Sequence, residues 1–481
     1  MFWFSFILKM ILLFAYSIEF QLTDEQKKVL NQMIESQVKK AHLHSFGVIV
    51  TNQDKTIFNK TYSEDDKINT QTPFIIGSVS KSFTTLGIYK LGIDINNTLD
   101  KYENLKDYID EDFAKSTTVS ELLNHTSGLE SFGRHRVYEK GYWNYSNYGF
   151  ALLGKIIESV STKTYQEYMN EKVFIPLNLI NTQAKYRKEI INSYEYFFGV
   201  RTKYMGLESE MDNVFYIPAG FISISIEDMG NYLRYYLKNY IEQTDEYKNY
   251  IFPMINKTVE IDYNVYYGSG MIVEKMKGGK IMFHHSGGTN SFLSHLYVYP
   301  ESDLAFFMVT NTNDIFCSTP AMELFDNIKN FLLYDTIGGI STSLGFYIHF
   351  TLDIIFIFVI SIPLAYLVIT IVRRIKKKKY TWFFGIKGKM MFGIDILILI
   401  ILPLFIIIAL YTFNPDIAYS IDNVKDLKFV IFMSSSTLFL TFIIKLVYVF
   451  IYNKYFKTFD LDSTKKLGSV DLDYMPVEEE N

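Results

Sequence analysis

Apolar residues in the N-terminal part of the chain follow two different periods. Over residues 24–40 they recur every three or four positions, which predicts an amphipathic helix. The apolar positions of that helix are Val29, Leu30, Met33, Ile34 and Val38. Residues 46–51 and 56–61 are instead rich in β-branched and aromatic residues, and the polar residues 52–55 between them indicate a β-hairpin.

Segments with β-type composition return much later in the chain. They cover residues 270–276, 280–284, 291–299 and 304–310, with a Gly278-Gly279 turn signal between the first two. The long intervening stretch has mostly helical periodicity, as in residues 147–160 and 226–240. Strands at both ends of a domain with helices inserted between them predict an α+β fold. We expect one antiparallel sheet flanked by helices, a largely helical second lobe, and a cleft between the lobes.

Four apolar segments lie outside this pattern. Residues 1–17 combine Lys9, an apolar run and small residues near Ser17, which predicts a cleaved signal peptide; an uncleaved signal anchor is the alternative. Three later runs, residues 346–372, 390–413 and 429–452, are each long enough to cross about 30 Å of hydrocarbon. We therefore expect three transmembrane helices after the main domain.

The charges that flank these runs predict their orientation. The loop of residues 373–389 begins with a cluster of Arg and Lys and should stay in the cytoplasm. Residues 414–428 then face the outside, and the acidic tail of residues 453–481 is cytoplasmic. The signal peptide independently exports residues 18–345. Both signals thus predict a multi-pass membrane protein whose main domain is extracellular or lumenal.

Three ionisable residues, Asp353, Asp395 and Lys445, fall inside the predicted spans. Such groups often mark transport sites, but three helices make a poor transporter, so we expect an anchor or a small helical bundle. Asp395 and Lys445 lie roughly 8 to 11 Å below the same membrane surface. They either form a charge pair, or Asp395 is protonated while Lys445 extends to the cytoplasmic face.

Composition narrows the function further. Hydrophobic residues make up 49% and aromatic residues 17% of the chain, so a large packed domain is expected. The net charge is −5, and no long basic stripe lies outside residues 373–379, which argues against a nucleic-acid partner. Cys317 is the single cysteine, and His42 and His44 have ligand-like spacing but lie beside a strand. We therefore expect no disulfide, no metal site and no cofactor.

The motif Ser-x-x-Lys indicates a candidate nucleophile, because it can place an amine beside a serine hydroxyl. It occurs three times, beginning at Ser36, Ser78 and Ser463. Only Ser78 follows an extended segment and opens an apolar helix, residues 80–91, with Lys81 on the same face. The hydrolase signatures Gly-x-Ser-x-Gly and His-Glu-x-x-His are absent from the sequence.

Two further motifs follow, Tyr145-Ser146-Asn147 and His285-Ser286-Gly287. Together with Ser78-Val79-Ser80-Lys81 they stand in the order of the three motifs of the serine β-lactamase and penicillin-binding-protein superfamily. Residues 122–129 also look like the loop that precedes the tyrosine motif in that superfamily. The sequence therefore resembles its class C-like branch of esterases, D-aminopeptidases and related hydrolases, over roughly residues 24 to 335.

The resemblance implies a role for each motif residue. Ser78 would attack the acyl carbon, and Lys81 and Tyr145 would share the proton that it loses. Asn147 would hold Lys81 and the substrate amide, while the backbone N–H groups of Ser78 and Gly288 would form the oxyanion hole. One of the two proton-sharing groups needs its pKa lowered by about three units to act as a base near neutral pH.

His285 stands where the family has a lysine, and it would orient a substrate carboxylate or the tyrosine. Ser286, Gly287 and Gly288 complete this substrate-binding segment. An imidazole is only partly charged at neutral pH, so a carboxylate would be held weakly. Peptidase or esterase activity is therefore favoured over true β-lactamase activity. We interpret two other histidines as structural: His125 as a loop-packing residue and His284 as a strand residue pointing away from the cleft.

The leading hypothesis is a membrane-anchored serine hydrolase that forms an acyl-enzyme with an amide or ester of a small molecule or peptide. The alternatives are a penicillin-binding module that stays acylated and a sensor whose hydrolase-like domain only recognises a ligand. The sequence does not predict an oligomeric state. Five sequons are candidate glycan sites, at Asn59, Asn96, Asn124, Asn144 and Asn256. Asn124 and Asn144 lie inside family motifs and should be too buried to accept a glycan.

Overall fold

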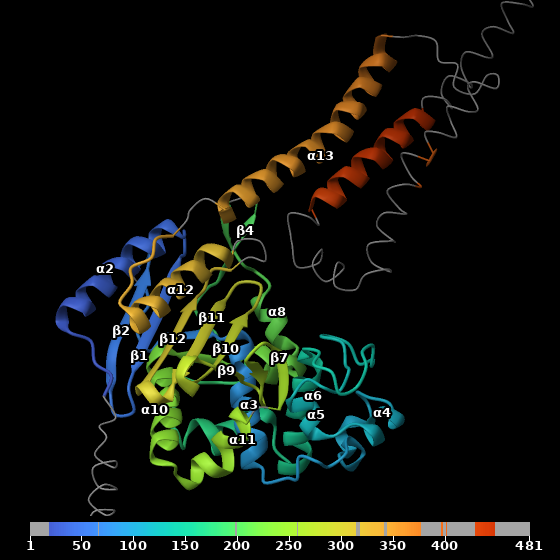
Figure 1. The fold of residues 1–481 in the computed structure, drawn as a ribbon. Coiled ribbons are helices and arrows are strands. Elements are labelled where there is room, and N and C mark those ends of the chain that lie inside the picture. Colours follow the sequence, from blue (N-terminus) through green and yellow to red (C-terminus); the bar gives the residue numbers. More distant parts are fainter. Residues whose placement is uncertain are drawn as a thin grey trace, which may run out of the picture. The chain divides into compact units, whose positions relative to one another are not determined.

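The structure is a computed structural model of the chain. It describes residues 19–65, 67–197, 200–256, 258–313, 318–340, 344–376, 396–397, 401 and 429–447. The chain divides into two compact units, one made of Met1–Tyr196 and Val200–Tyr347 and the other of Phe197–Gly199 and Ile348–Asn481. The predicted end of the main domain at residue 345 falls close to that division. The first unit contains the large sheet and every candidate site residue (Figure 1).

An antiparallel sheet of eight strands forms the centre of the first unit. Its order is β2-β1-β12-β11-β10-β9-β8-β7, so β1 at the start of the domain pairs with β12 at its end. The strands are β1 (Ser45–Thr51), β2 (Thr56–Ser63), β7 (Val259–Asp262), β8 (Val265–Tyr267), β9 (Ile272–Lys275), β10 (Ile281–Gly288), β11 (Leu293–Tyr299) and β12 (Leu304–Thr310). The predicted antiparallel sheet built from both β-rich regions is confirmed.

The short strands differ from the sequence-based expectation. β7 and β8, and the two-stranded pairs β3 (Pro73–Ile75) with β6 (Ser223–Ser225) and β4 (Tyr194–Phe197) with β5 (Val200–Lys203), were not predicted. Three or four residues are too few to show a period of two. β10 is longer than the predicted residues 280–284, so the whole His-Ser-Gly segment belongs to the sheet.

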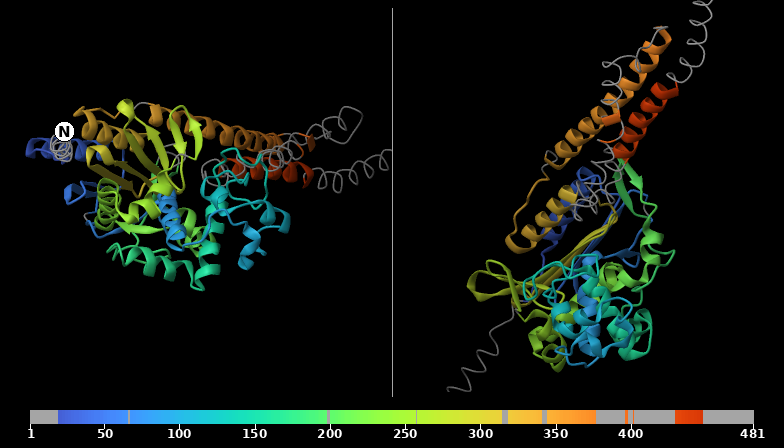
Figure 2. Two further views of the ribbon diagram at one scale, coloured as in Figure 1. Left: turned by 60° about the horizontal axis from the view of Figure 1, so that its bottom comes forward. Right: turned by 90° about the vertical axis from the view of Figure 1, so that its right-hand side faces the viewer.

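Helices cover both faces of the sheet (Figure 2). The helices α2 (Asp24–Lys40) and α12 (Ser318–Tyr334) pack on one face, and α10 (Ile226–Glu242) packs on the other. Alternate residues of β1 enter different cores: Phe46 packs toward α2 and α12, whereas Ile49 packs toward α10. The sheet therefore separates two hydrophobic cores, and both of its faces are buried.

The longer helices agree closely with their predicted ranges. α2 matches residues 24–40 and begins with a capping box, in which the Thr23 hydroxyl accepts from the Gln26 N–H and the Gln26 side chain accepts in return. α10 extends two residues beyond the prediction, and α6 (Asn147–Ser161) extends one. The other helices of this unit are α4 (Glu111–Ser116), α5 (Val119–Leu123), α7 (Tyr165–Met169), α8 (Leu207–Asp212), α9 (Ile217–Gly220) and α11 (Phe252–Ile255).

The helix α3 (Ser80–Lys90) is the central element of the helical part. Every residue from Ser80 to Ile88 is buried, so this helix touches protein on all sides. Thr84 Oγ1 on this helix donates to the Pro218 carbonyl at 2.6 Å, which satisfies a buried hydroxyl. A 3₁₀ turn, Gly77–Val79, precedes α3 and holds Ser78 at its partly exposed N-terminal end.

The second unit contains most of α13 (Leu344–Lys376), from Ile348 onward; this helix includes the first predicted span and has Pro363 inside it. Among the described residues, one helix is long and apolar enough to cross a membrane: Phe429–Val447, with 19 residues and a mean hydropathy of 2.0. Asp353–Ile369 in α13 forms a shorter apolar helix. Three transmembrane helices therefore stay a prediction.

Several sequence-based predictions fall outside the described residues. They are the signal peptide, Cys317, Asp395, most of the second apolar run and the acidic tail. Lys445 is described: its Nζ donates to the Tyr366 hydroxyl of α13 at 2.6 Å. Of the two sequons expected to be buried, Asn124 is only 5% exposed and Asn144 is half-buried.

Candidate active site

The three predicted motifs lie on different elements that meet at the N-terminal end of α3. Ser78 and Lys81 come from the 3₁₀ turn and the first turn of α3. Tyr145 immediately precedes α6, and Asn147 is the first residue of that helix, whose N-cap is the Ser146 side chain. The end of β10, with Gly288, packs against the same 3₁₀ turn. The fold thus brings together residues that are far apart in the sequence.

Lys81 is the most deeply buried member of this group, with none of its surface exposed. Its Nζ lies 3.1 Å from Ser78 Oγ, 2.7 Å from Asn147 Oδ1 and 2.7 Å from the carbonyl oxygen of Ala219 on α9. Burial lowers the pKa of Lys81 well below 10.5, because the protein interior disfavours the ammonium. The neutral amine is therefore accessible nearer to neutral pH than it is in a solvated lysine.

The three contacts of Lys81 also orient the neutral amine. A carbonyl oxygen only accepts hydrogen bonds, and so does Asn147 Oδ1, whose amide orientation is supported by Nδ2 donating to Ser131 Oγ at 3.2 Å. A neutral amine has two N–H groups and one lone pair. Once the N–H groups are used by Asn147 and Ala219, the lone pair faces the Ser78 hydroxyl. This is the geometry of a general base.

Tyr145 shows the opposite shift in pKa. Its hydroxyl is hydrogen-bonded to Ser78, and burial raises its pKa well above 10.0. The Lys81 ammonium nitrogen lies 4.7 Å from the centre of the Tyr145 ring. Of the two groups expected to share a proton, Lys81 is therefore the one adjusted to act as base, and Tyr145 remains a neutral phenol that can donate.

Two glycines, Gly77 and Gly287, explain how the backbone near Ser78 closes on β10. Gly77 has φ +52°, and a Cβ there would collide with the Gly288 nitrogen. A Cβ on Gly287 would collide with the carbonyl oxygen of Ile76. These close approaches place the N–H of Gly288 beside the turn that carries Ser78, as an oxyanion hole built from both residues requires.

His285 is buried at 2% exposure and lies on β10. Its Nδ1 is 2.6 Å from the Ser286 carbonyl oxygen, and its Nε2 is 3.3 Å from the Tyr267 hydroxyl. Burial, together with the positive charge of Lys81, lowers the pKa of His285 from 6.5 to about 3. The ring is therefore neutral at physiological pH, and both of its nitrogens have protein partners.

His125 and Tyr267 are part of the site but were not predicted as functional residues. His125 is buried, with φ +59°, and its ring centre lies 4.4 Å from that of Tyr145. Its Nε2 is 3.1 Å from the Tyr267 hydroxyl, which itself reaches His285. His125 does pack in a loop as interpreted, but its ring also contacts Tyr145 of the second motif. Its position in the loop of residues 122–129 was the only available signal.

The remaining strand residues alternate as a β-strand requires. Ser286 is exposed, and with His284 it lies on the sheet face opposite to His285. His284 Nδ1 lies 3.3 Å from His295 Nε2, and the His284 ring stacks on that of Tyr297. These contacts confirm that His284 points away from the site. The substrate-binding role of Ser286 stays a prediction.

The loop that contacts Asn147 is held by its own packing. The Ser131 hydroxyl accepts from Asn147 Nδ2. The next residue, Phe132, packs its ring against Tyr216 with 5.8 Å between ring centres, and the Tyr216 hydroxyl donates to the Phe132 carbonyl.

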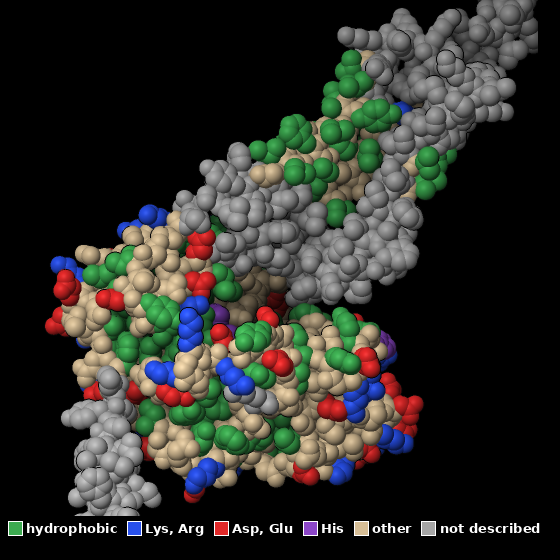
Figure 3. Space-filling model, in the orientation of Figure 1, with side chains coloured by type: hydrophobic (Ala, Val, Ile, Leu, Met, Phe, Trp, Pro, Cys, Tyr) green, Lys and Arg blue, Asp and Glu red, His purple; other side chains and the backbone are tan. Residues whose placement is uncertain are grey.

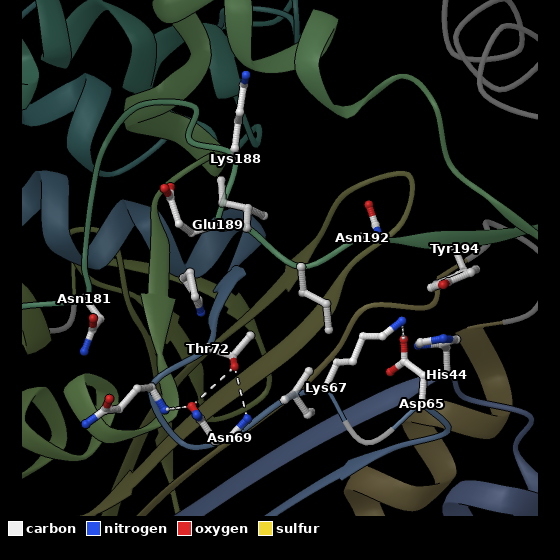
Figure 4. A pocket seen from close by; sticks show the side chains of 15 residues that line it. His44, Asp65, Lys67, Asn69, Thr72, Asn181, Lys188, Glu189, Asn192 and Tyr194 are labelled. Atoms are coloured by element: carbon white, nitrogen blue, oxygen red, sulfur yellow. Dashed lines mark hydrogen bonds and ion pairs between the residues drawn. The ribbon is translucent and has the colours of Figure 1, made fainter.

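A separate polar pocket of about 470 Å³ contains none of the predicted site residues (Figure 4). His44 stacks on Tyr194 at 4.0 Å between ring centres, and Asp65 pairs with Lys67 at 3.1 Å. Among the residues that the structure describes, no cluster of three or more His, Cys, Asp or Glu side chains could hold a metal ion.

Comparisons with known proteins agree with this architecture. A family model described as Beta-lactamase matches residues 30–317, more than half of the chain. Protein flp of Staphylococcus aureus (strain N315) is 21% identical over 355 residues, which cover 66% of this chain and 70% of that protein. Beta-lactamase-like protein 4 of Dictyostelium discoideum is 27% identical over 252 residues, which cover 42% and 44% of the two chains.

A solved structure shows the same fold. The octameric penicillin-binding protein homologue from Pyrococcus abyssi has a TM-score of 0.51 to this chain at 22% sequence identity, covering 63% of this chain and 77% of that one. The family match includes the segments that carry Ser78, Tyr145 and His285. Because that match spans more than half of the chain, this protein belongs to the beta-lactamase family, within the β-lactamase/transpeptidase-like serine hydrolase superfamily.

Proposed function

We propose that this protein is a serine hydrolase that forms an acyl-enzyme through Ser78 on an amide or ester substrate. The observation that supports it most strongly is the buried Lys81 amine, 3.1 Å from Ser78 Oγ, with its other two contacts made to obligate acceptors. A lysine that served only packing would not need its lone pair directed at a serine hydroxyl.

The proposed reaction has two stages. In acylation, Ser78 Oγ bonds to the acyl carbon while its proton passes to Lys81 Nζ, and the N–H groups of Ser78 and Gly288 stabilise the oxyanion. Tyr145 then gives its proton to the leaving nitrogen or oxygen and recovers one from Lys81. In deacylation, water attacks the acyl carbon and loses a proton to the Tyr145–Lys81 pair. The bond between the acyl carbon and Ser78 Oγ then breaks, and the pair returns a proton to Ser78 Oγ.

Peptidase or esterase activity fits the site better than β-lactamase activity. A β-lactam carries a carboxylate, and the position that would orient it is His285, whose ring is neutral and whose nitrogens both have partners.

Labelling of the full chain tests the proposal. The protein is incubated with a fluorophosphonate and, separately, with a fluorescent penicillin, and adducts are located by mass spectrometry. We expect the fluorophosphonate adduct on Ser78 alone, its loss in Ser78→Ala and its retention in Ser36→Ala. An adduct on another serine would contradict the nucleophile. A penicillin adduct that forms quickly and persists would instead favour a binding module that stays acylated.

We also propose that the chain is attached to a membrane and that its catalytic domain is extracellular or lumenal. Large apolar side chains are exposed along Phe429–Val447, for example Phe432 at 66%, and along α13, for example Ile362 at 66%. Hydrophobic side chains cover the visible part of α13 (Figure 3). Contiguous apolar surface of this kind is unusual on a helix facing water.

Fractionation tests the attachment. The full chain should stay in the membrane pellet after alkaline extraction, and added protease should degrade the catalytic domain in intact cells or spheroplasts. N-terminal sequencing of the mature protein distinguishes a cleaved signal peptide from an uncleaved anchor. Release of the full chain by alkali would contradict the attachment, and protection from protease would contradict the orientation.

A further inference from the structure

We propose that His125 and Tyr267 are positioning residues of the catalytic centre, which hold His285 as a neutral ring with no N–H group left for a substrate. This inference rests on the proposed serine-hydrolase function and deepens it, because it implies substrates without a carboxylate beside the scissile bond. The argument begins with the hydrogen bonds at the two ends of the group, where the direction of donation is fixed by the backbone.

The first end is the backbone N–H of Ser146, which lies 3.1 Å from His125 Nδ1. A backbone N–H can only donate, so His125 Nδ1 must carry a lone pair. The proton of the neutral ring is then on Nε2, which is 3.1 Å from the Tyr267 hydroxyl oxygen. His125 therefore donates to Tyr267.

The second end is the carbonyl oxygen of Ser286, which lies 2.6 Å from His285 Nδ1. A carbonyl can only accept, so His285 Nδ1 must carry a proton. The Nε2 of the neutral ring is then an acceptor, and the Tyr267 hydroxyl, 3.3 Å away, donates to it. Tyr267 thus accepts from one histidine and donates to the other.

These hydrogen bonds fix the position of every proton in the network. Each group donates to the next, from the Ser146 N–H through His125, Tyr267 and His285 to the Ser286 carbonyl. The two histidines are therefore opposite tautomers. All three side chains are buried: His125 is 1% exposed, Tyr267 0% and His285 2%. A second proton on His125 would occupy Nδ1 and break the hydrogen bond that this atom accepts from the Ser146 N–H. A second proton on His285 would occupy Nε2 and break the hydrogen bond that this atom accepts from the Tyr267 hydroxyl.

The neighbouring charges support the neutral state. When Lys81 on α3 is protonated, its charge disfavours a second proton on either ring, and His284 on β10 has the same effect on His285. The ring centre of Tyr145 lies 4.4 Å from that of His125 and 6.4 Å from that of His285. The network therefore forms the wall against which the Tyr145 ring is placed.

Two consequences follow for catalysis. First, loss of the Tyr267 hydroxyl removes the Nε2 partner of both histidines and leaves each ring held at Nδ1 alone. The rings can then tilt, which moves the wall behind Tyr145. Second, His285 cannot offer a charge or an N–H group to a substrate carboxylate. The site should therefore prefer a substrate that is neutral at this position.

Nuclear magnetic resonance of the full chain with ¹⁵N-labelled histidine tests the network independently of activity. The chain has eight histidines, so the two signals are assigned with His125→Asn and His285→Asn. We expect one Nε2–H and one Nδ1–H tautomer, and neither ring should titrate between pH 5 and 8. Two rings of the same tautomer, or titration of either in that range, would overturn the proposal even if the protein proved to be an active hydrolase.

Kinetics then test the effect on the reaction. Tyr267→Phe keeps the ring and removes the hydroxyl, and we expect a fall in kcat on the order of 10-fold, with less change in KM for a neutral p-nitrophenyl ester. The matched control is Tyr168→Phe, which also loses a buried hydroxyl hydrogen bond, to the Gly87 carbonyl on α3. An equal effect of both substitutions on kcat would show that Tyr267 is merely structural.

The substrate preference is tested with two esters of similar size, one neutral and one ending in a carboxylate. The wild-type chain should hydrolyse the neutral ester with the higher kcat/KM, and His285→Lys should shift the ratio toward the carboxylate ester. A wild-type preference for the carboxylate ester would overturn the specificity argument. Failure to hydrolyse either ester would contradict the proposed hydrolase function. The hydrogen-bond network would then still be tested separately, by the histidine tautomers seen in the magnetic resonance experiment.

Discussion

At the residue scale, burial shifts the pKa values of two candidate catalytic groups in opposite directions. Burial disfavours the charged form of each group, which lowers the pKa of Lys81 and raises that of Tyr145. A shared-proton mechanism alone does not say which group is the base. The structure favours Lys81, because its lone pair is directed at Ser78 when the amine is neutral.

The first prediction follows from this asymmetry. Lys81→Met and Tyr145→Phe should each lower the acylation rate on the order of 10² or more. In the wild-type chain the acylation rate should rise with pH as Lys81 loses its proton. Tyr145→Phe should keep this rise because Lys81 is still present, and Lys81→Met should abolish it. The measurement is the pH dependence of fluorophosphonate labelling, with circular dichroism as the control for folding. The reverse pattern would identify Tyr145 as the base.

Sequence alone indicated the motif residues but not the residues behind them. Ser78 and Lys81 were identifiable because a fixed spacing on a helix places them together, and the other two motifs followed from their order. His125 and Tyr267 carry no spacing signal, since one lies in a loop and the other at the end of a three-residue strand. Their contact depends on tertiary packing, which a linear pattern does not record.

At the element scale, the strand β10 and the 3₁₀ turn before α3 pack with almost no space between their backbones. Gly287 faces the Ile76 carbonyl and the Ser294 hydroxyl, whereas Gly288 has only ordinary contacts at 3.9 Å and 4.0 Å. The two neighbouring glycines thus differ sharply in what a methyl group would meet.

The second prediction uses these glycines as a matched pair. Gly287→Ala should destabilise the protein by about 1–3 kcal/mol, because the new Cβ forces β10 away from the turn. Gly288→Ala should change the free energy of unfolding by less than about 0.5 kcal/mol. Denaturant unfolding measures both. Equal stability of the two variants would show that the close approach is absent in solution.

Helices and strands were predictable from sequence where their hydrophobic periodicity extends over many residues. The helices α2, α6 and α10 agree within two residues, since several turns establish their period. β10 was predicted to end early because glycines have low β propensity. Pairing with β11 overrides that propensity and extends the strand to Gly288.

At the scale of the whole molecule, burial lowers the pKa of five histidines in the first unit. They are His44, His125, His284, His285 and His295. The pKa of His284 falls from 6.5 to about 4 and that of His285 to about 3. In the unfolded chain these rings titrate near pH 6.5. Below that pH the unfolded state binds more protons, so the folded state loses stability as pH falls.

The third prediction is therefore acid destabilisation that begins unusually early. Each such histidine contributes a slope of up to about 1.4 kcal/mol per pH unit below pH 6.5. Denaturant unfolding between pH 7 and 5 should show a steep loss of stability, and His284→Asn should reduce the slope. His135→Asn is the control, because His135 is exposed. A stability that stays constant over this range would show that burial does not keep these five rings unprotonated.

The last prediction concerns Lys445, for which the structure supplies a partner that sequence did not suggest. Its Nζ donates to the Tyr366 hydroxyl at 2.6 Å and lies 4.8 Å from the centre of that ring. An unpartnered lysine in hydrocarbon costs about 2.5 to 3.5 kcal/mol on insertion scales, so the acceptor matters if this helix spans a membrane. Tyr366→Phe should then lower the amount of membrane-inserted protein, measured after alkaline extraction, and Lys445→Met combined with Tyr366→Phe should restore it. The alternative contact is the ion pair between Asp395 and Lys445 that their equal depth predicts. In that case Asp395→Asn should lower the amount of inserted protein, and the double variant that exchanges the two charges should be inserted as well as the wild-type chain.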